Sequence, residues 1–410
     1  MKTARFYRHK DVTGPMRQIT RYIVFELIKI FFIVLSALTI LMLLIGLVQR
    51  AVREGMGPLP VLRLIPYLLP DALRFAIPGT MLFAVCSVYG RMSADNEIVA
   101  IKSLGISPMV VVWPAVILAF GISLSAVWFN DVAVSWGRQG INRVILQSVE
   151  EIAYGTLRSQ QSYSTRRFSI HVKQVKGRKL IRPTICFHAH GDSPPVTLVA
   201  RQAELRFNPE SNRLKIMIED TQFDIGSNTH GHWPDLLEYE LPLATISGDN
   251  TMEPGPSQIA MRDIPRRAGI QRSEIQQYKQ AMAATAAYQM LTGDFSGLQD
   301  VQWNSRYEKL AWKKFKLNRL NTEVWRRWAN GFSCLAFVFV GASLAILLRT
   351  ADIWTSFGLC FLPILIVYYP VMQFGVDRAK IGELPVYSVW IGNLLLFFLG
   401  ALFLRRVNRY

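Results

Sequence analysis

Long apolar segments separated by polar stretches form the main pattern along this chain. A helix needs about 20 predominantly apolar residues to cross the hydrocarbon core of a bilayer. Runs of about that length without a charged side chain occur at residues 30–48, 103–130, 329–348, 353–376 and 384–404. A further run at 75–89 is shorter and extends upstream through the charged segment "VLRLIPYLLPDALR". The pattern predicts an α-helical polytopic membrane protein with six transmembrane helices, arranged three plus three.

A large polar insert separates the two groups of spans. In it, "RFSIHVKQV" alternates apolar and polar residues as a half-buried strand does. "VTLVARQAELRF" and "RLKIMIEDTQFDI" flank the turn cluster "NPESN", which predicts a long hairpin. We therefore expect an antiparallel β domain over 160–250. After the linker "TMEPGPSQIAMRDIP", residues 271–292 and 303–328 are expected to be helical, the second helix running into the fourth span.

These elements predict four regions. Residues 1–130 hold an N-terminal tail and the first three spans, with a short cytoplasmic helix at about 93–105. Residues 131–270 form the inserted β domain, and 271–328 a helical extension that leads to the fourth span. Residues 329–410 hold the last three spans and a short tail.

Composition supports a membrane protein and suggests its orientation. The chain is 51% hydrophobic and 18% charged, against about a quarter charged in typical soluble domains. Its net charge of +17 is concentrated partly at both ends, where Lys and Arg residues crowd the first 29 positions and the last few. Basic tails and an even number of spans predict cytoplasmic termini. A second basic cluster before the fourth span opposes this assignment, but long loops translocate largely regardless of charge.

The stretch "GRMSADNEIVAIKSLGISP" between the second and third spans predicts a capped amphipathic helix. Ser93 is the expected N-cap, Asp95 and Glu97 fall in the first turn, Lys102 falls in the last, and Gly105 ends the helix. Ile98, Ile101 and Leu104 form a narrow apolar face. Periodicity alone allows two interpretations, an interfacial helix resting on lipid or a docking helix for a soluble partner.

An energy source for transport would have to come from another polypeptide. The chain contains no Gly-Lys dipeptide and therefore no Walker A loop for nucleotide phosphates. It also lacks a nucleophile elbow and an HExxH motif, so no enzymatic activity and no cofactor are expected of this chain.

Six motifs in order resemble the LptF/LptG permeases, the membrane subunits of the lipopolysaccharide exporter, over essentially the whole chain. They are "RYIVFELIK", "LLPDALRFAIPGTMLFAVCSVYGR", "DNEIVAIKSLGIS", "ELRFNPESNRLKI", "EVWRRWANGFSCLAFVFVGASLAI" and "GELPVYSVWIGNLLLFFLGALFL". The insert is longer than usual for this family, chiefly in the helical part at 270–328.

The resemblance implies a permease in the bacterial inner membrane that extracts lipopolysaccharide or a similar glycolipid and passes it to a periplasmic β-jellyroll bridge protein. It implies a second permease of the same type, identical or homologous, a periplasmic jellyroll-like insert, and a cytoplasmic ABC ATPase that binds the ATP. No nucleic acid is expected as a partner. The short helix would seat in a groove of the ATPase, with Glu97 matching the family's glutamate. The residues expected at that contact are Asp95, Glu97, Ile98, Ile101 and Gly105.

Four basic residues are candidates for binding the substrate's phosphates. Arg50 and Arg53 follow the first span and share roughly one helix face, and guanidinium groups bind phosphate bidentately. The family resemblance here is regional, and helix-end anchoring is the alternative. Lys29 matches a family lysine at the other end of that span, where anchoring by snorkelling is the alternative. Arg74 lies within the second span one turn from Asp71, which allows an internal ion pair or a contact with substrate.

Prolines in the second span and histidines in the insert are two further features of the sequence. Pro70 and Pro78 can kink the second span. Histidines at alternate positions can bind zinc, but nothing in the sequence brings the two segments together and no acidic partners are evident, so we expect no metal site. The residues concerned are Cys186, His188, His190, His230 and His232.

A different class of function remains open from sequence. The chain could be a membrane-anchored envelope scaffold whose β domain binds a periplasmic partner without transport. A scaffold has no need for a capped cytoplasmic helix or for a basic pair at the outer leaflet, and the sequence predicts both. An intramembrane enzyme would need paired acids or a nucleophile within spans, where Asp71 is the acid present.

Overall fold

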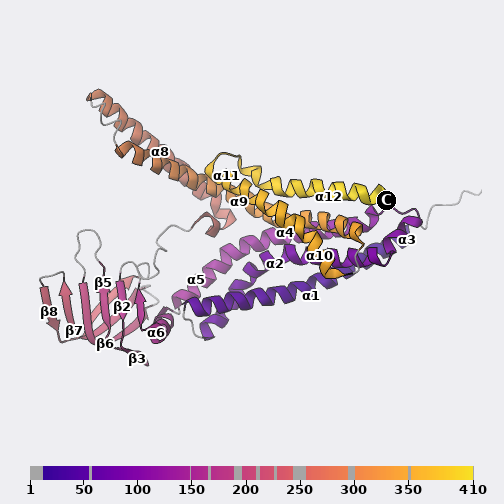
Figure 1. Cartoon of the computed structure of the whole chain (residues 1–410). Coiled ribbons are helices and arrows are strands. Elements are labelled where there is room, and N and C mark those ends of the chain that lie inside the picture. Colours follow the sequence, from indigo (N-terminus) through magenta and orange to yellow (C-terminus); the bar gives the residue numbers. More distant parts are fainter. Residues whose placement is uncertain are drawn as a thin grey trace, which may run out of the picture. The chain divides into compact units, whose positions relative to one another are not determined.

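The computed structural model describes residues 13–54, 58–147, 149–164, 168–188, 196–208, 213–225, 229–242, 255–293, 301–349 and 352–409. The chain divides into two compact units (Figure 1). The membrane unit comprises Met1–Leu41, Pro70–Ser135 and Pro256–Tyr410, and the β unit comprises Met42–Leu69 and Trp136–Gly255. The division therefore passes through the first two helices of the chain.

Helices account for most of the described residues. The α-helices are α1 (Thr13–Glu54), α2 (Pro58–Ala94), α3 (Glu97–Ser103), α4 (Met109–Val132), α5 (Arg138–Gln147), α6 (Val149–Gln160), α8 (Ile264–Leu291), α9 (Val301–Leu348), α10 (Ile353–Pro363), α11 (Tyr369–Ile381) and α12 (Ile391–Arg409). Two π-helical segments, η1 (Ala133–Gly137) and η5 (Ile364–Tyr368), extend α4 and join α10 to α11. Short 3₁₀ turns are η2 (Pro256–Gln258), η3 (Met261–Asp263) and η6 (Val386–Trp390).

Within the described residues, six helical segments are long and apolar enough to cross a membrane, as predicted. They are Gln18–Val52, Pro60–Ala94, Met109–Ile145, Gln302–Leu348, Ile353–Ile381 and Val386–Val407. The third begins at Met109 and not at 103 as expected, because the chain turns at Gly105 before entering the span. The second runs as one helix through both Pro70 and Pro78.

Close packing of α4 against α9 forms the centre of the membrane unit. A Cβ at Gly331 would come within 2.2 Å of the Val127 side chain, so glycine is what allows the two helix backbones to approach. Such small residues are typical of helix interfaces in lipid, where dispersion contacts replace the hydrophobic effect. By contrast, α1 carries large exposed apolar side chains along its length, among them Phe25, Phe32 and Val48. That surface suits lipid or another apolar helix.

The two helical segments expected at 271–292 and 303–328 are present as α8 and the first half of α9, and the two form a hairpin (Figure 1). Its first helix begins at Ile264, earlier than the expected 271, and includes part of the predicted linker. Lys313 pairs with Glu274 at 2.9 Å, and the Trp303 indole donates to Gln289 at 3.0 Å. These contacts hold α8 against the part of α9 that precedes the fourth span.

The β unit contains an antiparallel sheet of nine described strands, as the alternating pattern predicted. The strands are β1 (Ser162–Ser164), β2 (Phe168–His171), β3 (Gln174–Lys176), β4 (Lys179–Ile181), β5 (Thr184–Phe187), β6 (Val196–Asn208), β7 (Arg213–Ile225), β8 (Thr229–Trp233) and β9 (Leu237–Pro242). The predicted long hairpin is the β6–β7 pair, in register from Val196 opposite Ile225 to Asn208 opposite Arg213. Most of its "NPESN" turn lies outside the described residues.

Short strands pair with each half of these two long strands. β5 pairs with the first half of β6 and β4 with the second half, while β9 pairs with the first half of β7 and β8 with the second half. Near the midpoint, Arg182 and Asp220 have positive φ angles of 49° and 58°, which bend the backbone where partners change. The segment "RFSIHVKQV" was therefore wrongly predicted as one strand, because β2 pairs with β5 and β3 with β4.

Two expected domain boundaries fall elsewhere in the structure. Position 131 lies inside α4, and two helices, α5 and α6, precede the first strand. Residues from Pro256 onward belong to the membrane unit and not to the β unit. In the β unit, α5 packs Ile141 and Val144 against Leu64 and Leu68 of α2, which gives the first turns of that helix their own small core.

α6 is fixed to the sheet through one buried tyrosine. The Tyr154 hydroxyl donates to the Arg178 carbonyl at 2.5 Å, with the Leu205 carbonyl as a second acceptor within reach of the same hydrogen at 3.2 Å, and it accepts from the Leu205 N–H at 2.9 Å. Its ring joins the sheet core with Leu157. Burial raises the pKa of the Tyr154 hydroxyl, since the interior disfavours the phenolate.

Tyr154→Phe should destabilise the β unit by about 1–3 kcal/mol, because the buried Leu205 N–H loses its partner. The raised pKa means that the tyrosine's contribution is complete below pH about 10 and is lost as pH rises through the folded-state pKa. The difference between wild type and Tyr154→Phe should thus shrink at alkaline pH. Thermal unfolding of the full-length protein in detergent, followed by circular dichroism, measures this. The exposed Tyr288 supplies the control Tyr288→Phe, and equal melting of Tyr154→Phe and wild type would contradict the assignment.

Candidate functional site

The short helix between the second and third spans is α3, and it begins later than predicted. α2 continues to Ala94, so Ser93 is not an N-cap and Asp95 lies in the turn before the helix. The buried Ser93 hydroxyl instead donates to the Ile346 carbonyl of α9 at 2.8 Å. Asn96 occupies the N-cap position in a left-handed conformation, without a side-chain capping bond.

The predicted end of α3 is confirmed. Gly105 has a φ of +76°, its N–H donates to the Lys102 carbonyl, and the Ile106 N–H donates to the Ile101 carbonyl. These two bonds are the Schellman pattern, which satisfies the last carbonyls of a helix and favours glycine at the left-handed position. Lys102 lies in the last turn, as predicted.

One face of α3 packs inward and another is exposed. Ile98 is 4% exposed and belongs to the core of the membrane unit, with Ile101 packed against the same core. The expectation that the apolar face would be available for docking was therefore wrong for Ile98. Leu104 is 75% exposed, and Glu97 is half-buried at the start of the helix. We call five of the exposed residues the α3 surface: Asp95, Val99, Ala100, Ser103 and Leu104.

Polar contacts connect the α2–α3 corner to three other helices. Arg91, near the end of α2, pairs with Glu26 of α1 at 3.1 Å. Ser93 bonds α9, and the Lys102 ammonium donates to the Val407 carbonyl of α12 at 2.5 Å. The corner therefore lies beside the end of α12 (Figure 1). Of these bonds, the one to α12 comes from α3 itself and those to α1 and α9 come from the end of α2. Glu26 of the motif "RYIVFELIK" takes part in the contact with α1.

A cavity of about 270 Å³ lies among α2, α4, α9 and the α10–η5–α11 span. Arg74 lines it, pairing with Asp71 at 2.7 Å and donating to Asn130 at 3.5 Å. The Arg74 guanidinium also lies 4.6 Å from the centre of the Phe75 ring. The internal ion pair expected of Arg74 is therefore present, and the contact with substrate stays a prediction for a residue that also lines a cavity.

The cavity is amphipathic. Arg74 and Arg326 supply positive charge, and Asn130 and Asn330 supply amides. The remaining wall is largely apolar and aromatic: Phe75, Pro78, Leu82, Phe337, Phe361, Tyr368, Tyr369 and Met372. At about 270 Å³ it is slightly smaller than typical ligand pockets. It suits part of an anionic amphiphile, with the anion at the arginines and an apolar group against the rings.

The other candidate cations lie along α1. Lys29 is exposed and Arg50 half-buried, with no charged residue from Ile30 to Gln49. Twenty helical residues span about 30 Å, the thickness of a hydrocarbon core. Lys29 and Arg50 therefore mark the two ends of an uncharged membrane-length segment. The helix continues through Arg53 as expected, but the side chain of Arg53 is outside the described residues.

The histidine segments differ from expectation in one respect. His230 and His232 of β8 bond Asp224 and Asp220 of β7, each at 2.6 Å, so they have the acidic partners that were not evident in the sequence. Cys186 lies in β5 and His188 just after it, while His190 is outside the described residues. Across the described part of the chain, His, Cys, Asp and Glu form no group of three or more suited to a metal ion.

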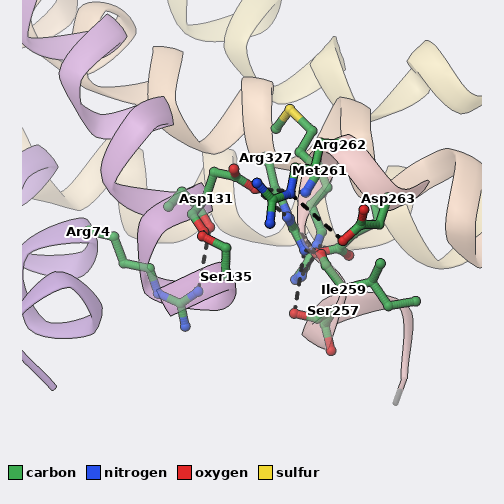
Figure 2. Close-up of polar contacts among 12 residues, drawn as sticks. Arg74, Asp131, Ser135, Ser257, Ile259, Met261, Arg262, Asp263 and Arg327 are labelled. Atoms are coloured by element: carbon green, nitrogen blue, oxygen red, sulfur yellow. Dashed lines mark hydrogen bonds and ion pairs between the residues drawn. The ribbon is translucent and has the colours of Figure 1, made fainter. Parts of the chain in front are cut away.

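A buried guanidinium at the start of the fourth span was missed by sequence reasoning (Figure 2). Arg327 is 1% exposed and bonds Glu323 at 3.1 Å and Asp131 of α4 at 3.2 Å. It also donates to the carbonyls of Ile259 at 2.7 Å and Ser257 at 3.5 Å. The Met261 N–H donates to Asp131 at 2.7 Å. One side chain thus joins α4, α9 and the segment that follows the β unit.

The local part of this cluster was detectable in "EVWRRW". Glu323 precedes Arg326 by three residues and Arg327 by four, which is the spacing of helical ion pairs. The contact with Asp131 spans 196 positions and has no local signal.

Comparison with known proteins identifies the family. The profile described as "Lipopolysaccharide export system permease LptF/LptG" matches residues 21–406. The chain belongs to the LptF/LptG family. It is accordingly a permease component of the lipopolysaccharide export system. The family consists of inner-membrane permeases that work with an ATPase and other Lpt proteins and are not catalytic enzymes. A search of curated proteins gave no match.

Arg327→Met should destabilise this LptF/LptG permease by about 3–5 kcal/mol, because it leaves the buried Glu323 and the half-buried Asp131 without their shared cation. Arg327→Lys should be less damaging, since it keeps the charge and loses only the multiple bonds. Thermal loss of monodispersity in detergent, measured by size-exclusion chromatography, ranks the variants. A melting temperature unchanged in Arg327→Met would show that the cluster does not stabilise the fold.

Proposed function

We propose that the chain is the permease subunit of an ATP-driven exporter. It extracts lipopolysaccharide or a similar envelope glycolipid from the inner membrane and passes it to a periplasmic β-jellyroll bridge protein. A separate cytoplasmic ABC ATPase binds and hydrolyses the ATP. The observation that carries the proposal is the α2–α3 corner, which is bonded to three membrane helices while the α3 surface stays exposed.

A helix anchored in this way suits coupling to a motor. The ATPase engages the α3 surface through Asp95 and Leu104 and approaches Glu97 with a basic residue. Force applied there passes through Arg91, Ser93 and Lys102 into the membrane helices. Ile98 and Ile101 serve this coupling from within, by packing α3 onto its own core, and Gly105 ends the helix.

The substrate path begins at the cations of the spans. The amphipathic cavity matches one part of a phosphorylated lipid, with Arg74 and Arg326 at the phosphate and the aromatic wall at an apolar chain. Arg50 and Arg53 engage phosphates at the outer leaflet, and Lys29 at the inner leaflet. These roles rest on charge and on the uncharged 30–49 segment of α1.

Energetics explain why an ATPase and an apolar acceptor are both needed. Exposing each CH₂ of an acyl chain to water costs about 0.8 kcal/mol, so several chains cost tens of kcal/mol. Contacts with a few arginines cannot offset that amount. The β unit, placed in the periplasm with both termini in the cytoplasm, receives the chains on its jellyroll-like sheet. A second permease covers the exposed apolar side chains of α1 and of the α10–α11 span.

An envelope scaffold without transport is the alternative function. Its β domain would bind a periplasmic partner and the spans would only anchor it. Depletion of the protein distinguishes the two. Newly made glycolipid should accumulate in the inner membrane on depletion, and its normal arrival at the outer membrane would favour the scaffold.

Glu97→Lys should abolish co-purification of the ATPase while leaving the chain in the membrane fraction, because the reversed charge repels a basic partner. Pull-down from solubilised membranes measures the bound ATPase.

Glu383→Lys is the matched control, since it makes the same charge change on an exposed residue beyond α11, away from α3. ATPase recovery at the wild-type level with Glu97→Lys would refute the assignment.

A further inference from the structure

A second, smaller cavity of about 120 Å³ lies where α9, the end of α11 and the loop after the β unit meet. Its lining is mostly polar and contains three cations. The lining residues are Pro256, Ser257, Arg319, Thr322, Glu323, Arg326 and Lys380. Arg319, Thr322, Glu323 and Arg326 follow one face of α9 at helical spacing.

The lining of this cavity has more positive than negative charges. Both oxygens of Glu323 are occupied, Oε2 by Arg326 at 3.0 Å and Oε1 by Arg326 at 2.8 Å and Arg327 at 3.1 Å. Glu323 is therefore neutralised by two guanidinium groups. Lys380 pairs with Asp377 at 3.0 Å, outside the lining. Among the described residues no carboxylate pairs with Arg319, whose guanidinium lies 5.7 Å from the Phe315 ring centre. The site has a net positive charge and donors from two helices.

The positions of these cations relative to the bilayer indicate which kind of anion they can meet. The uncharged run of the fourth span begins at Ala329. Arg326 lies three residues before it, or about 5 Å along the helix, and Arg319 lies ten residues before it, or about 15 Å. Lys380 lies four residues, or about 6 Å, beyond the uncharged run of the fifth span. The headgroup layer of a bilayer occupies about 5–8 Å on each side of the hydrocarbon core. Arg326 and Lys380 therefore start at the level of lipid phosphates, and Arg319 starts further out, above that layer.

We propose that this cavity binds a phosphate group, through Arg319 and Lys380 with Ser257 as a neutral partner. Its position favours the headgroup phosphate of a bilayer lipid, and free phosphate has the same chemistry. The bound anion would join α9, α11 and the loop after the β unit. Arg326 lines both cavities, but Arg319 and Lys380, which carry this inference, line the smaller one and not the Arg74 cavity. The inference therefore does not depend on transport.

The test uses the full-length protein and lipids of defined headgroup. The protein is reconstituted in bilayer discs of phosphatidylglycerol, extracted, and examined by native mass spectrometry for retained lipid. Wild type should retain one phosphatidylglycerol per chain more tightly than the rest. Arg319→Gln and Lys380→Gln should each weaken that retention by about tenfold or more, the loss expected for a hydrogen bond to a charged group.

Two matched variants define specificity. Lys314→Gln removes an exposed cation from the same helix outside the cavity and should retain the lipid. Arg319→Lys keeps the charge and should restore most of the binding, which also shows that any loss in Arg319→Gln is not misfolding. A separate titration of delipidated protein with inorganic phosphate, followed by phosphorus NMR, shows whether the site takes free phosphate.

The outcomes separate clearly. Lipid lost with Arg319→Gln but kept with Lys314→Gln supports a lipid headgroup. Arg319-dependent phosphate binding without lipid retention supports the site with free phosphate as its ligand. If neither ligand depends on Arg319, or if Lys314→Gln has the same effect, the site is overturned. None of these readouts involves glycolipid export, so failure here leaves the transport proposal untouched.

Discussion

The need to neutralise a charge inside an apolar bundle organises the far end of the membrane unit. Arg327 is buried, and a buried charge persists only when paired and hydrogen bonded. Its partners include Asp131, four residues before the second segment of the membrane unit ends at Ser135, and Ser257, just after the third segment begins at Pro256. The chain therefore leaves and re-enters the membrane unit at the same guanidinium. Both connections of the polar insert are held to α9 by one cluster.

α9 links this cluster to the proposed motor contact. Arg327 lies near the middle of the helix and Ile346, whose carbonyl accepts from Ser93, lies near its end. Nineteen residues of one uninterrupted helix separate them, about 30 Å. A helix without a break transmits displacement along its axis, so α3 and the base of the insert are connected through a single rigid element. The amphipathic cavity lies beside the same helix, between these two points.

Much of this architecture follows from local patterns in the sequence, and the exceptions have physical causes. Uncharged runs predict the spans, alternation predicts β6 and β7, and three-residue spacing predicts the Asp71–Arg74 pair. Ser93 was wrongly predicted as an N-cap because a serine before an apolar run can equally lie inside a continuing helix. There its hydroxyl bonds the distant Ile346 carbonyl. The spacing of Ile98 and Ile101 does not indicate whether they pack against the core of this chain or against a partner protein. Arg327 and Asp131 meet only through the fold, and Arg326 was recognisable as basic but not as part of a cavity wall.

The uninterrupted length of α9 also has a mechanical consequence beyond the membrane. From Val301 to Trp328 it continues for 28 residues outside the uncharged span, about 42 Å, with α8 packed alongside it. Because the part within the bilayer and the part outside it are one stiff rod, the rod acts as a lever. A tilt of roughly ten degrees at the membrane would swing its outer tip by roughly 7 Å, so small rearrangements among the spans become large excursions in the space beyond.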